Sequence, residues 1–399
     1  MSNVPNKREQ NQTCLDSAER EGLRPKGNVP NLRFPEFQGE WKEHKLEDIT
    51  AEIGDGIHAT PIYDDNGTFY FVNGNNISEY GIIITATTQK VTEEEALRNN
   101  ASALNSYSIL LSINGTVGNV ALYKNESIML GKSACYINVS SNINRNYIFY
   151  YLMMPKCQFY FTSELTGTTI KNLSLKSVRK TKVLLPNANE QSKIARLFDA
   201  INERIATQNK IIDKLQSLIK GLRVSLMQIE NGNIVHLDEI AQIYQPQTIS
   251  STELTEDGFL VYGANGIIGK YKQYNHKTEQ ICITCRGNTC GMVNYTKPMS
   301  WITGNAMVIN TDEHQNKVCK RYLYHYLSAY NFNSIISGSG QPQIVRTPLE
   351  QLKVPLPTFL EQKQKATFLD KIQGKIEISN KTLNLYLQQK QYLLRQMFI

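Results

Sequence analysis

Two stretches of this chain carry apolar side chains at alternating steps of three and four residues. They follow Pro186 and Pro357 and align without a gap at a constant offset (357 − 186 = 171). A sustained alternation of this kind predicts a helix that buries one apolar stripe against a partner helix. In the first stretch the apolar positions are Ile194, Phe198, Ile201, Ile205, Ile212, Leu215, Ile219, Leu222 and Leu226. In the second stretch they are Leu369, Ile372, Ile376, Leu383, Tyr386, Leu393 and Met397.

A polar residue interrupts both stripes at the equivalent place, Gln208 in the first and Ser379 in the second, and Lys390 interrupts the second stripe again. Two helices of one register in one chain are most simply partners of each other. Antiparallel pairing would bring Gln208 close to Ser379, because both residues lie near the middle of their helices. A polar layer there can fix the register at some cost in stability.

Each predicted helix begins in the same way. A strand-like apolar run, residues 183–185, stops at Pro186, which lacks the amide hydrogen that a continuing ladder needs. Glu190 then lies in the first helical turn, where the helix dipole favours a negative charge. The second copy repeats this Pro-x-x-x-Glu-Gln sequence from Pro357 to Gln362.

The segments ahead of the two helices also match each other, in the same order and at low identity. The matching pairs are LEDITAEI (46–53) with LDEIAQIY (237–244), TFYFVNGNNI (68–77) with FLVYGANGII (259–268), SILLSINGTVGNVALY (108–123) with ICITCRGNTCGMVNY (281–295), LGKSACYINV (130–139) with ITGNAMVINT (302–311), NYIFYYLM (146–153) with RYLYHYLS (321–328), and LTGTTIKNL (165–173) with SGSGQPQIV (337–345). Short β-rich runs with Gly and Asn turns and one or two short helices predict a compact α+β domain, made twice by duplication.

The expected fold is therefore α+β, with two similar α/β domains separated by two long helices that pack as an antiparallel coiled coil with pseudo-two-fold symmetry. Residues 1–30 are polar and lack periodicity, which predicts a flexible leader. The expected segments that follow it are domain 1 (31–182), helix 1 (183–230), domain 2 (231–353) and helix 2 (354–399).

Bulk composition narrows the class of protein. The chain has 399 residues and a net charge of +7, which suits a nucleic-acid partner. Seven scattered cysteines indicate reduced thiols, and Cys282-x-x-Cys285 has no second ligand pair at zinc-site spacing, so we expect no metal. We see neither a signal-peptide core nor an apolar stretch long enough to span a bilayer, so we expect a cytoplasmic protein without a membrane partner.

Motifs for catalysis are missing. Gly131-Lys132-Ser133 matches the end of a P-loop, but Glu126 stands where the first glycine must lie. There is no Gly-x-Gly-x-x-Gly after a strand, no Gly-x-Ser-x-Gly and no His-Glu-x-x-His. These absences favour a binding protein over an enzyme, with no catalytic residue of its own.

Polar residues in the loops of both domains are of the types that recognise bases. Arg and Lys can pair with guanine, and Asn and Gln with adenine, although Asn and Gly in loops more often serve turn geometry. The candidates in domain 1 are Asn73, Asn75, Asn76, Lys132, Ser133, Thr168, Thr169 and Lys171. The candidates in domain 2 are Asn265, Arg286, Asn288, Asn305, Gln341 and Gln343.

This duplicated arrangement resembles the specificity subunit of type I restriction–modification systems. The resemblance runs from Leu32 onward, through LRFPEF-x-GEW, the two Pro-x-x-x-Glu-Gln helix starts and the variable domain before each. It implies that domains 1 and 2 are target recognition domains, each recognising one half of a bipartite site in double-stranded DNA. The matching helices would set the spacing and dock two modification subunits.

The same resemblance assigns the cofactors to partner chains and none to this one. S-adenosylmethionine would belong to the modification subunits, which methylate adenine, and ATP and Mg to the restriction subunits. Two other classes remain open at this point. One is a tandem-repeat coiled-coil scaffold without DNA recognition, which would show no salt-sensitive DNA binding. The other is a self-contained methyltransferase or nuclease, which the missing motifs disfavour.

Overall fold

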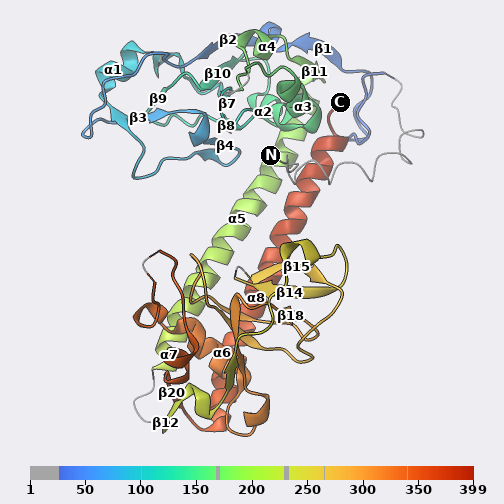
Figure 1. Ribbon diagram of the computed structural model, residues 1–399. Coiled ribbons are helices and arrows are strands. Elements are labelled where there is room, and N and C mark those ends of the chain that lie inside the picture. Colours follow the sequence, from blue (N-terminus) through green and yellow to red (C-terminus); the bar gives the residue numbers. More distant parts are fainter. Residues whose placement is uncertain (1–26, 100, 168–170, 229–232, 265, 339) are drawn as a thin grey trace. The chain divides into compact units, whose positions relative to one another are not determined.

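The computed structural model describes residues 27–99, 101–167, 171–228, 233–264, 266–338 and 340–399. The chain forms two compact units. The first unit is Met1–Ala206 with Asn384–Ile399, and the second is Thr207–Leu383. Two long helices, α5 (Ala188–Met227) and α8 (Phe359–Gln396), each contribute one part to both units (Figure 1).

Each unit is built on a four-stranded antiparallel sheet with the same strand order. In the first unit the order is β2 (Thr50–Asp55), β10 (Ala134–Val139), β7 (Ser108–Ser112) and β8 (Val120–Leu122). In the second unit it is β13 (Gln242–Tyr244), β19 (Ala306–Asn310), β16 (Ile281–Thr284) and β17 (Val293–Tyr295).

The smaller sheets repeat as well. A three-stranded sheet has a central strand with one antiparallel and one parallel neighbour in both units. Its strands are β6 (Lys90–Val91), β3 (Phe69–Val72) and β9 (Ile128–Leu130) in the first unit, and β15 (Gly266–Tyr271), β14 (Phe259–Gly263) and β18 (Trp301–Ile302) in the second. Two-stranded sheets pair β1 (Lys42–Lys45) with β11 (Lys182–Leu185), β12 (Asn233–His236) with β20 (Lys353–Leu356), and β4 (Ile77–Ser78) with β5 (Gly81–Ile82).

Short helices complete the units. The α-helices are α1 (Glu93–Arg98), α2 (Arg145–Met153), α3 (Pro155–Ser163), α4 (Leu175–Arg179), α6 (Lys320–Ala329) and α7 (Arg346–Glu350). The 3-10 helices are η2 (Leu46–Ile49), η3 (Gly74–Asn76), η4 (Ala101–Ala103), η5 (Leu237–Glu239), η6 (Ser251–Glu253), η7 (Asp312–His314) and η8 (Phe332–Ser334). No helix in the described ranges combines the length and apolar character that crossing a membrane requires.

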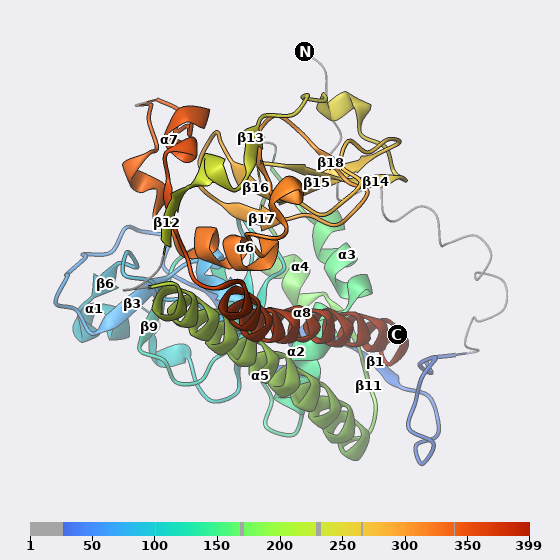
Figure 2. The ribbon, with the colours of Figure 1, turned by 90° about the horizontal axis from the view of Figure 1, so that it is seen from below.

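In each unit a short helix joins the sheet to the long helices. In the first unit the rings of Tyr150 and Phe198 stack at 4.9 Å, and Tyr147 lies 5.3 Å from Phe398, so α2 contacts both α5 and the end of the chain. In the second unit Tyr322 of α6 packs in one apolar cluster with Leu369 of α8, and Figure 2 shows α6 between the sheet and α8. Burial of these large side chains removes apolar surface from water, which stabilises each attachment.

The two long helices pair in antiparallel fashion within each unit, as the hydrophobic pattern predicts. In the first unit Phe198, near the start of α5, lies 5.6 Å from Phe398, just beyond the end of α8. In the second unit the late part of α5 packs on the early part of α8, and Lys365 Nζ donates to the carbonyl of Leu226 at 2.7 Å. The predicted proximity of Gln208 and Ser379 is confirmed, because Gln208 Nε2 donates to the Ser379 carbonyl at 3.1 Å.

The glutamine of each Pro-x-x-x-Glu-Gln sequence has the same role in both units. Gln191 donates to the Pro186 carbonyl and accepts from the amide of Asn144, just before α2. Gln362 donates to the Pro357 carbonyl and accepts from the amide of Cys319, just before α6. Each glutamine thus ties the start of a long helix to the short helix that carries the domain.

The second interruption of the apolar stripe, Lys390, is an ion-pair position. Its side chain is 2% exposed and its Nζ lies 2.6 Å from Glu79 Oε2. Glu79 connects β4 to β5, so this pair attaches a hairpin of the first unit to α8. Sequence pattern alone marked Lys390 as a defect in the stripe.

Candidate nucleic-acid interface

Three loops meet at one end of the large sheet in the first unit. The loop after β7 is held to the turn before β10, since the Ile113 amide donates to the Ser133 carbonyl at 3.0 Å. The loop before α4 joins them, since the Leu173 amide donates to the Ile113 carbonyl at 2.8 Å. Asn114 and Asn172 are opposite each other in an isolated antiparallel bridge. Backbone hydrogen bonds therefore bring three distant segments to one surface.

The second unit repeats this construction bond for bond. The Cys285 amide donates to the Asn305 carbonyl at 3.1 Å, and the Ile344 amide donates to the Cys285 carbonyl at 3.0 Å. Arg286 and Gln343 form the matching antiparallel bridge. We call the two sets of loops the loop surfaces: residues 73–76, 113–119, 131–133 and 171–173 in the first unit, and residues 264, 285–291, 303–305, 337–338 and 340–343 in the second.

The turn within the central loop needs glycine at the same place in both units. Gly115 follows Asn114 with φ +75°, and Gly287 follows Arg286 with φ +85°. Residues with a side chain rarely adopt this left-handed backbone conformation. Glycine therefore sets the direction of the turn and with it the direction in which the preceding side chain points. The two loops thus share one backbone conformation and differ in the side chain that precedes the glycine.

Some predicted contact residues of the first unit shape its loops. Asn73 Oδ1 accepts a hydrogen bond from Ser133 Oγ at 2.8 Å, and Ser133 Oγ in turn accepts from the Gly74 amide. Asn76 accepts from the Asn73 amide and donates to the Ile83 carbonyl. These contacts favour the turn-forming role for Asn73, Asn76 and Ser133. Their part in DNA contact stays a prediction.

Other predicted residues of the first unit point to solvent. Asn75, Lys132 and Lys171 are exposed, and the structure brings them to the same loop surface. Neither lysine has an acidic partner among the described residues. Thr168 and Thr169 lie outside the described residues.

The predicted residues of the second unit lie together on its loop surface. Arg286, Asn288, Asn305, Gln341 and Gln343 are all exposed, and they come from three loops that the backbone hydrogen bonds join. Asn265 lies outside the described residues. No carboxylate occurs in the sequence of either loop surface, so its cations have no internal counter-charge. Such a surface suits phosphate and base-edge contacts.

Sequence reasoning missed Asn114 and Asn172. Asn114 occupies in the first unit the place of Arg286 in the second, and Asn172 occupies the place of Gln343. The signal was present in the paired segments, where Ile-Asn-Gly-Thr aligns with Cys-Arg-Gly-Asn-Thr. An inserted residue, Asn288, obscures that match.

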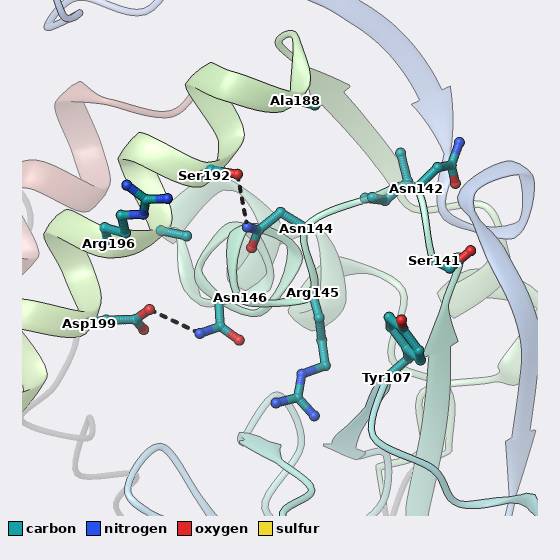
Figure 3. Close-up of a pocket in the computed structure, with 12 residues that line it drawn as sticks. Tyr107, Ser141, Asn142, Asn144, Arg145, Asn146, Ala188, Ser192, Arg196 and Asp199 are labelled. Carbon is teal, nitrogen blue, oxygen red and sulfur yellow. Dashed lines mark hydrogen bonds between the residues drawn. The ribbon is translucent and has the colours of Figure 1, made fainter.

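The opposite end of the first unit's sheet carries its anchor to α5. A cavity of about 480 Å³ lies there. Figure 3 shows the side chains that line it, which come from α2 and the segment before it, from α5, and from Tyr107, which precedes β7. Asn144 donates to Ser192 at 3.4 Å and Asn146 donates to Asp199 at 3.0 Å. The length of β7 separates this junction from the loop surface, roughly 15 Å. The cavity therefore belongs to the attachment of the domain.

Asp370 of the second unit stands where Asp199 stands in the first (370 − 199 = 171), but its partners are ionisable. Asp370 accepts hydrogen bonds from Arg321 and from His325 Nε2, and His325 Nδ1 accepts from Arg223 Nε at 3.1 Å. Burial lowers the pKa of His325; Arg223 and Arg321 add to that effect and Asp370 opposes it. The matching partner of Asp199 is the hydroxyl of Tyr150.

Acidification is therefore expected to destabilise the second unit. Below pH ~6.5 the unfolded histidine binds a proton that the buried one does not, so the free energy of unfolding falls as pH decreases, by up to ~1.4 kcal/mol per pH unit. Buried His276, whose pKa burial also lowers, acts in the same direction. Urea unfolding between pH 7.5 and 5.5, followed at Trp301 in a Trp41→Phe background, measures the loss. A His325→Gln variant should weaken the dependence, and an unchanged slope would contradict this assignment.

Comparison with known proteins gives one consistent result. A family model described as the type I restriction modification DNA specificity domain matches residues 38–217 and again residues 230–387. The type I restriction enzyme EcoprrI specificity subunit of Escherichia coli is 24% identical over 329 residues, which cover 77% of this chain and 80% of that protein. The MjaVIII specificity subunit of Methanocaldococcus jannaschii is 23% identical over 396 residues, covering 88% of this chain and 89% of the other.

Among solved structures, the S subunit of a type I restriction-modification system from M. genitalium has a similar fold. Its TM-score is 0.64 at 18% sequence identity, and the match covers 93% of this chain and 99% of that one.

Proposed function

Because this chain belongs to the family of type I restriction-modification DNA specificity proteins, we propose that each of its loop surfaces contacts one half of a bipartite DNA site. The observation that carries this proposal is the duplication of the loop surface. Each matched range of the family model contains one of these surfaces, and both surfaces are held by equivalent backbone hydrogen bonds. Two copies of one recognition device in a single chain fit two half-sites.

In this proposal the chain recognises DNA and its partners perform the chemistry. Two modification subunits carry S-adenosylmethionine and methylate adenine, and restriction subunits supply the ATP- and Mg-dependent cleavage. The paired helices α5 and α8 set the separation of the half-sites and dock the modification subunits. The antiparallel pairing and the Gln208–Ser379 contact support this role, since a fixed helix register is what a spacer needs.

Substitutions in the two loop surfaces are expected to act on different half-sites. The double variant Lys132→Ala/Lys171→Ala should affect recognition of one half-site, as seen in methylation. The double variant Gln341→Ala/Gln343→Ala should alter the base preference at the other half-site. Each lost phosphate contact should also reduce the slope of log affinity against log salt by about 1. Methylation-sensitive sequencing of cells that express the full complex measures the first effect, and a salt series of DNA binding measures the second.

The salt series also distinguishes this proposal from the alternative that the chain is a coiled-coil scaffold. A scaffold predicts no salt-sensitive DNA binding by the complex at all. If either pair of substitutions disturbs both halves equally, the assignment of one unit to one half is wrong.

A further inference from the structure

The two loop surfaces differ most informatively at the residue in front of the left-handed glycine. We propose that Asn114 and Arg286 select the base at one equivalent position of each half-site, adenine for Asn114 and guanine for Arg286. This inference rests on the proposed function and deepens it, because it names the bases that the two surfaces recognise.

The backbones around the two residues are equivalent. Both residues precede a glycine with positive φ, +75° at Gly115 and +85° at Gly287. Both lie opposite an amide residue in an antiparallel bridge, Asn172 for Asn114 and Gln343 for Arg286. The Cα–Cβ bond of each residue is therefore aimed in the same way with respect to its own sheet.

Both side chains are available to a ligand. Arg286 is exposed and Asn114 half-buried, and neither side chain has a hydrogen-bond or ion-pair partner within the described parts of the chain. A Cβ added at Gly115 or Gly287 would meet no atom within 4 Å, so the space beside the glycine that follows each residue is open. By contrast, the side chains of Asn73 and Asn76 are already engaged in the turn that they form.

The chemistry of the two side chains distinguishes the purines. In the major groove an Asn amide pairs with adenine through two hydrogen bonds: its oxygen accepts from adenine N6 and its nitrogen donates to adenine N7. An Arg guanidinium donates to both guanine O6 and N7. Each bidentate pair discriminates against the wrong base by on the order of 10- to 100-fold. Equivalent placement with different side chains therefore predicts different bases in the two halves.

The amide across each bridge lies beside this contact. Directly opposed residues in an antiparallel pair point to the same face with their Cβ atoms about 5 Å apart. Asn172 and Gln343 are thus placed to contact the adjoining base pair, since base pairs stack about 3.4 Å apart. A pair of neighbouring side chains, one on each loop, is the unit that we assign to each half-site.

Exchange of the two side chains tests the inference in the full complex with its modification subunits. Methylation-sensitive sequencing first gives the split motif of the wild type. Asn114→Arg should then change one position of one half from adenine to guanine, by 10-fold or more in relative methylation, and leave the other half unchanged. Arg286→Asn should make the converse change in the other half.

Matched controls carry the same charge change elsewhere. Asn66→Arg alters an exposed asparagine of the first unit, and Arg98→Asn alters an exposed arginine of α1. Both should keep the wild-type motif. An unchanged motif in Asn114→Arg or Arg286→Asn, with normal methylation, would overturn the inference.

If a variant methylates nothing, a second measurement on the wild-type complex tests the inference. The affinity of the wild-type complex is measured for DNA in which 7-deazaguanine replaces each guanine of one half in turn. In a second series 7-deazaadenine replaces each adenine of the other half. A loss of 10-fold or more at one position in each half supports the inference, and full affinity at every position overturns it. Failure of the proposed function looks different, because the wild-type complex would then methylate no split motif.

Discussion

Replacing Arg33 by Met is expected to lower the free energy of unfolding of the first unit by about 3 kcal/mol, because it leaves a buried carboxylate without its cation. Arg33 Nε and Nη2 each lie 2.7 Å from the carboxylate of Glu190, whose side chain is 0% exposed. Urea unfolding followed at Trp41 in a Trp301→Phe background measures the loss, since each unit contains one of the chain's two tryptophans.

The duplicated helix start supplies the control. Glu361 occupies the equivalent position in the second unit, but it is exposed and caps its own helix by accepting from Thr358. Glu361→Gln should therefore change stability by about 0.5 kcal/mol or less. Adding Glu190→Gln to Arg33→Met should recover part of the loss. If Arg33→Met costs no more than Glu361→Gln, the ion pair does not stabilise the first unit.

Replacing Glu79 by Gln is expected to cost the first unit about 2 kcal/mol. The change leaves the ammonium of Lys390, 2% exposed, without its carboxylate. The expected cost is smaller than for Arg33→Met because Glu79 is 32% exposed and water can reach the remaining amide. The same Trp41 fluorescence measures it.

Replacing the other partner of the ion pair should cost less stability. Lys390→Met keeps most of the buried aliphatic stem and leaves only the partly exposed Glu79, so we expect a loss below about 1 kcal/mol. The free energy of unfolding of the double variant Glu79→Gln/Lys390→Met should lie near that of the wild type. The double-mutant cycle gives the coupling energy of the pair. Equal losses for the two single variants would show that the asymmetry of exposure is unimportant here.

The sequence was sufficient to predict the long helices because their burial repeats along one stripe. Ile194, Phe198 and Ile205 are each at most 2% exposed, and Gln208 meets Ser379 as the antiparallel pairing requires. The α+β class of the domains followed less directly, from two weakly similar copies that had to share one fold. Hydrophobic periodicity and internal duplication are patterns within one sequence, so a single sequence is enough to detect them.

Polar contacts that reach outside the helix pair could not be predicted in the same way. Lys390 and Glu79 are 311 residues apart, and the stripe recorded Lys390 only as an interruption. The side chain of Asn73, a predicted contact residue, accepts a hydrogen bond from Ser133, and residue type alone does not reveal such a partner 60 residues away. Asn114 was missed for the converse reason, since only the folded loop shows that its side chain has no partner among the residues that the structure describes.

The contribution of Asn384–Ile399 to the first unit has a consequence for the order of biosynthesis. Leu394, Met397 and Phe398 belong to the same hydrophobic core as Trp41 and Tyr147, yet a ribosome adds them after the whole of the second unit. The second unit can therefore fold while it is being synthesised, whereas the domain that emerges first must wait for the last helix to close its core. During that interval the nascent first domain exposes apolar surface that the last helix later covers, and such surface is prone to aggregation.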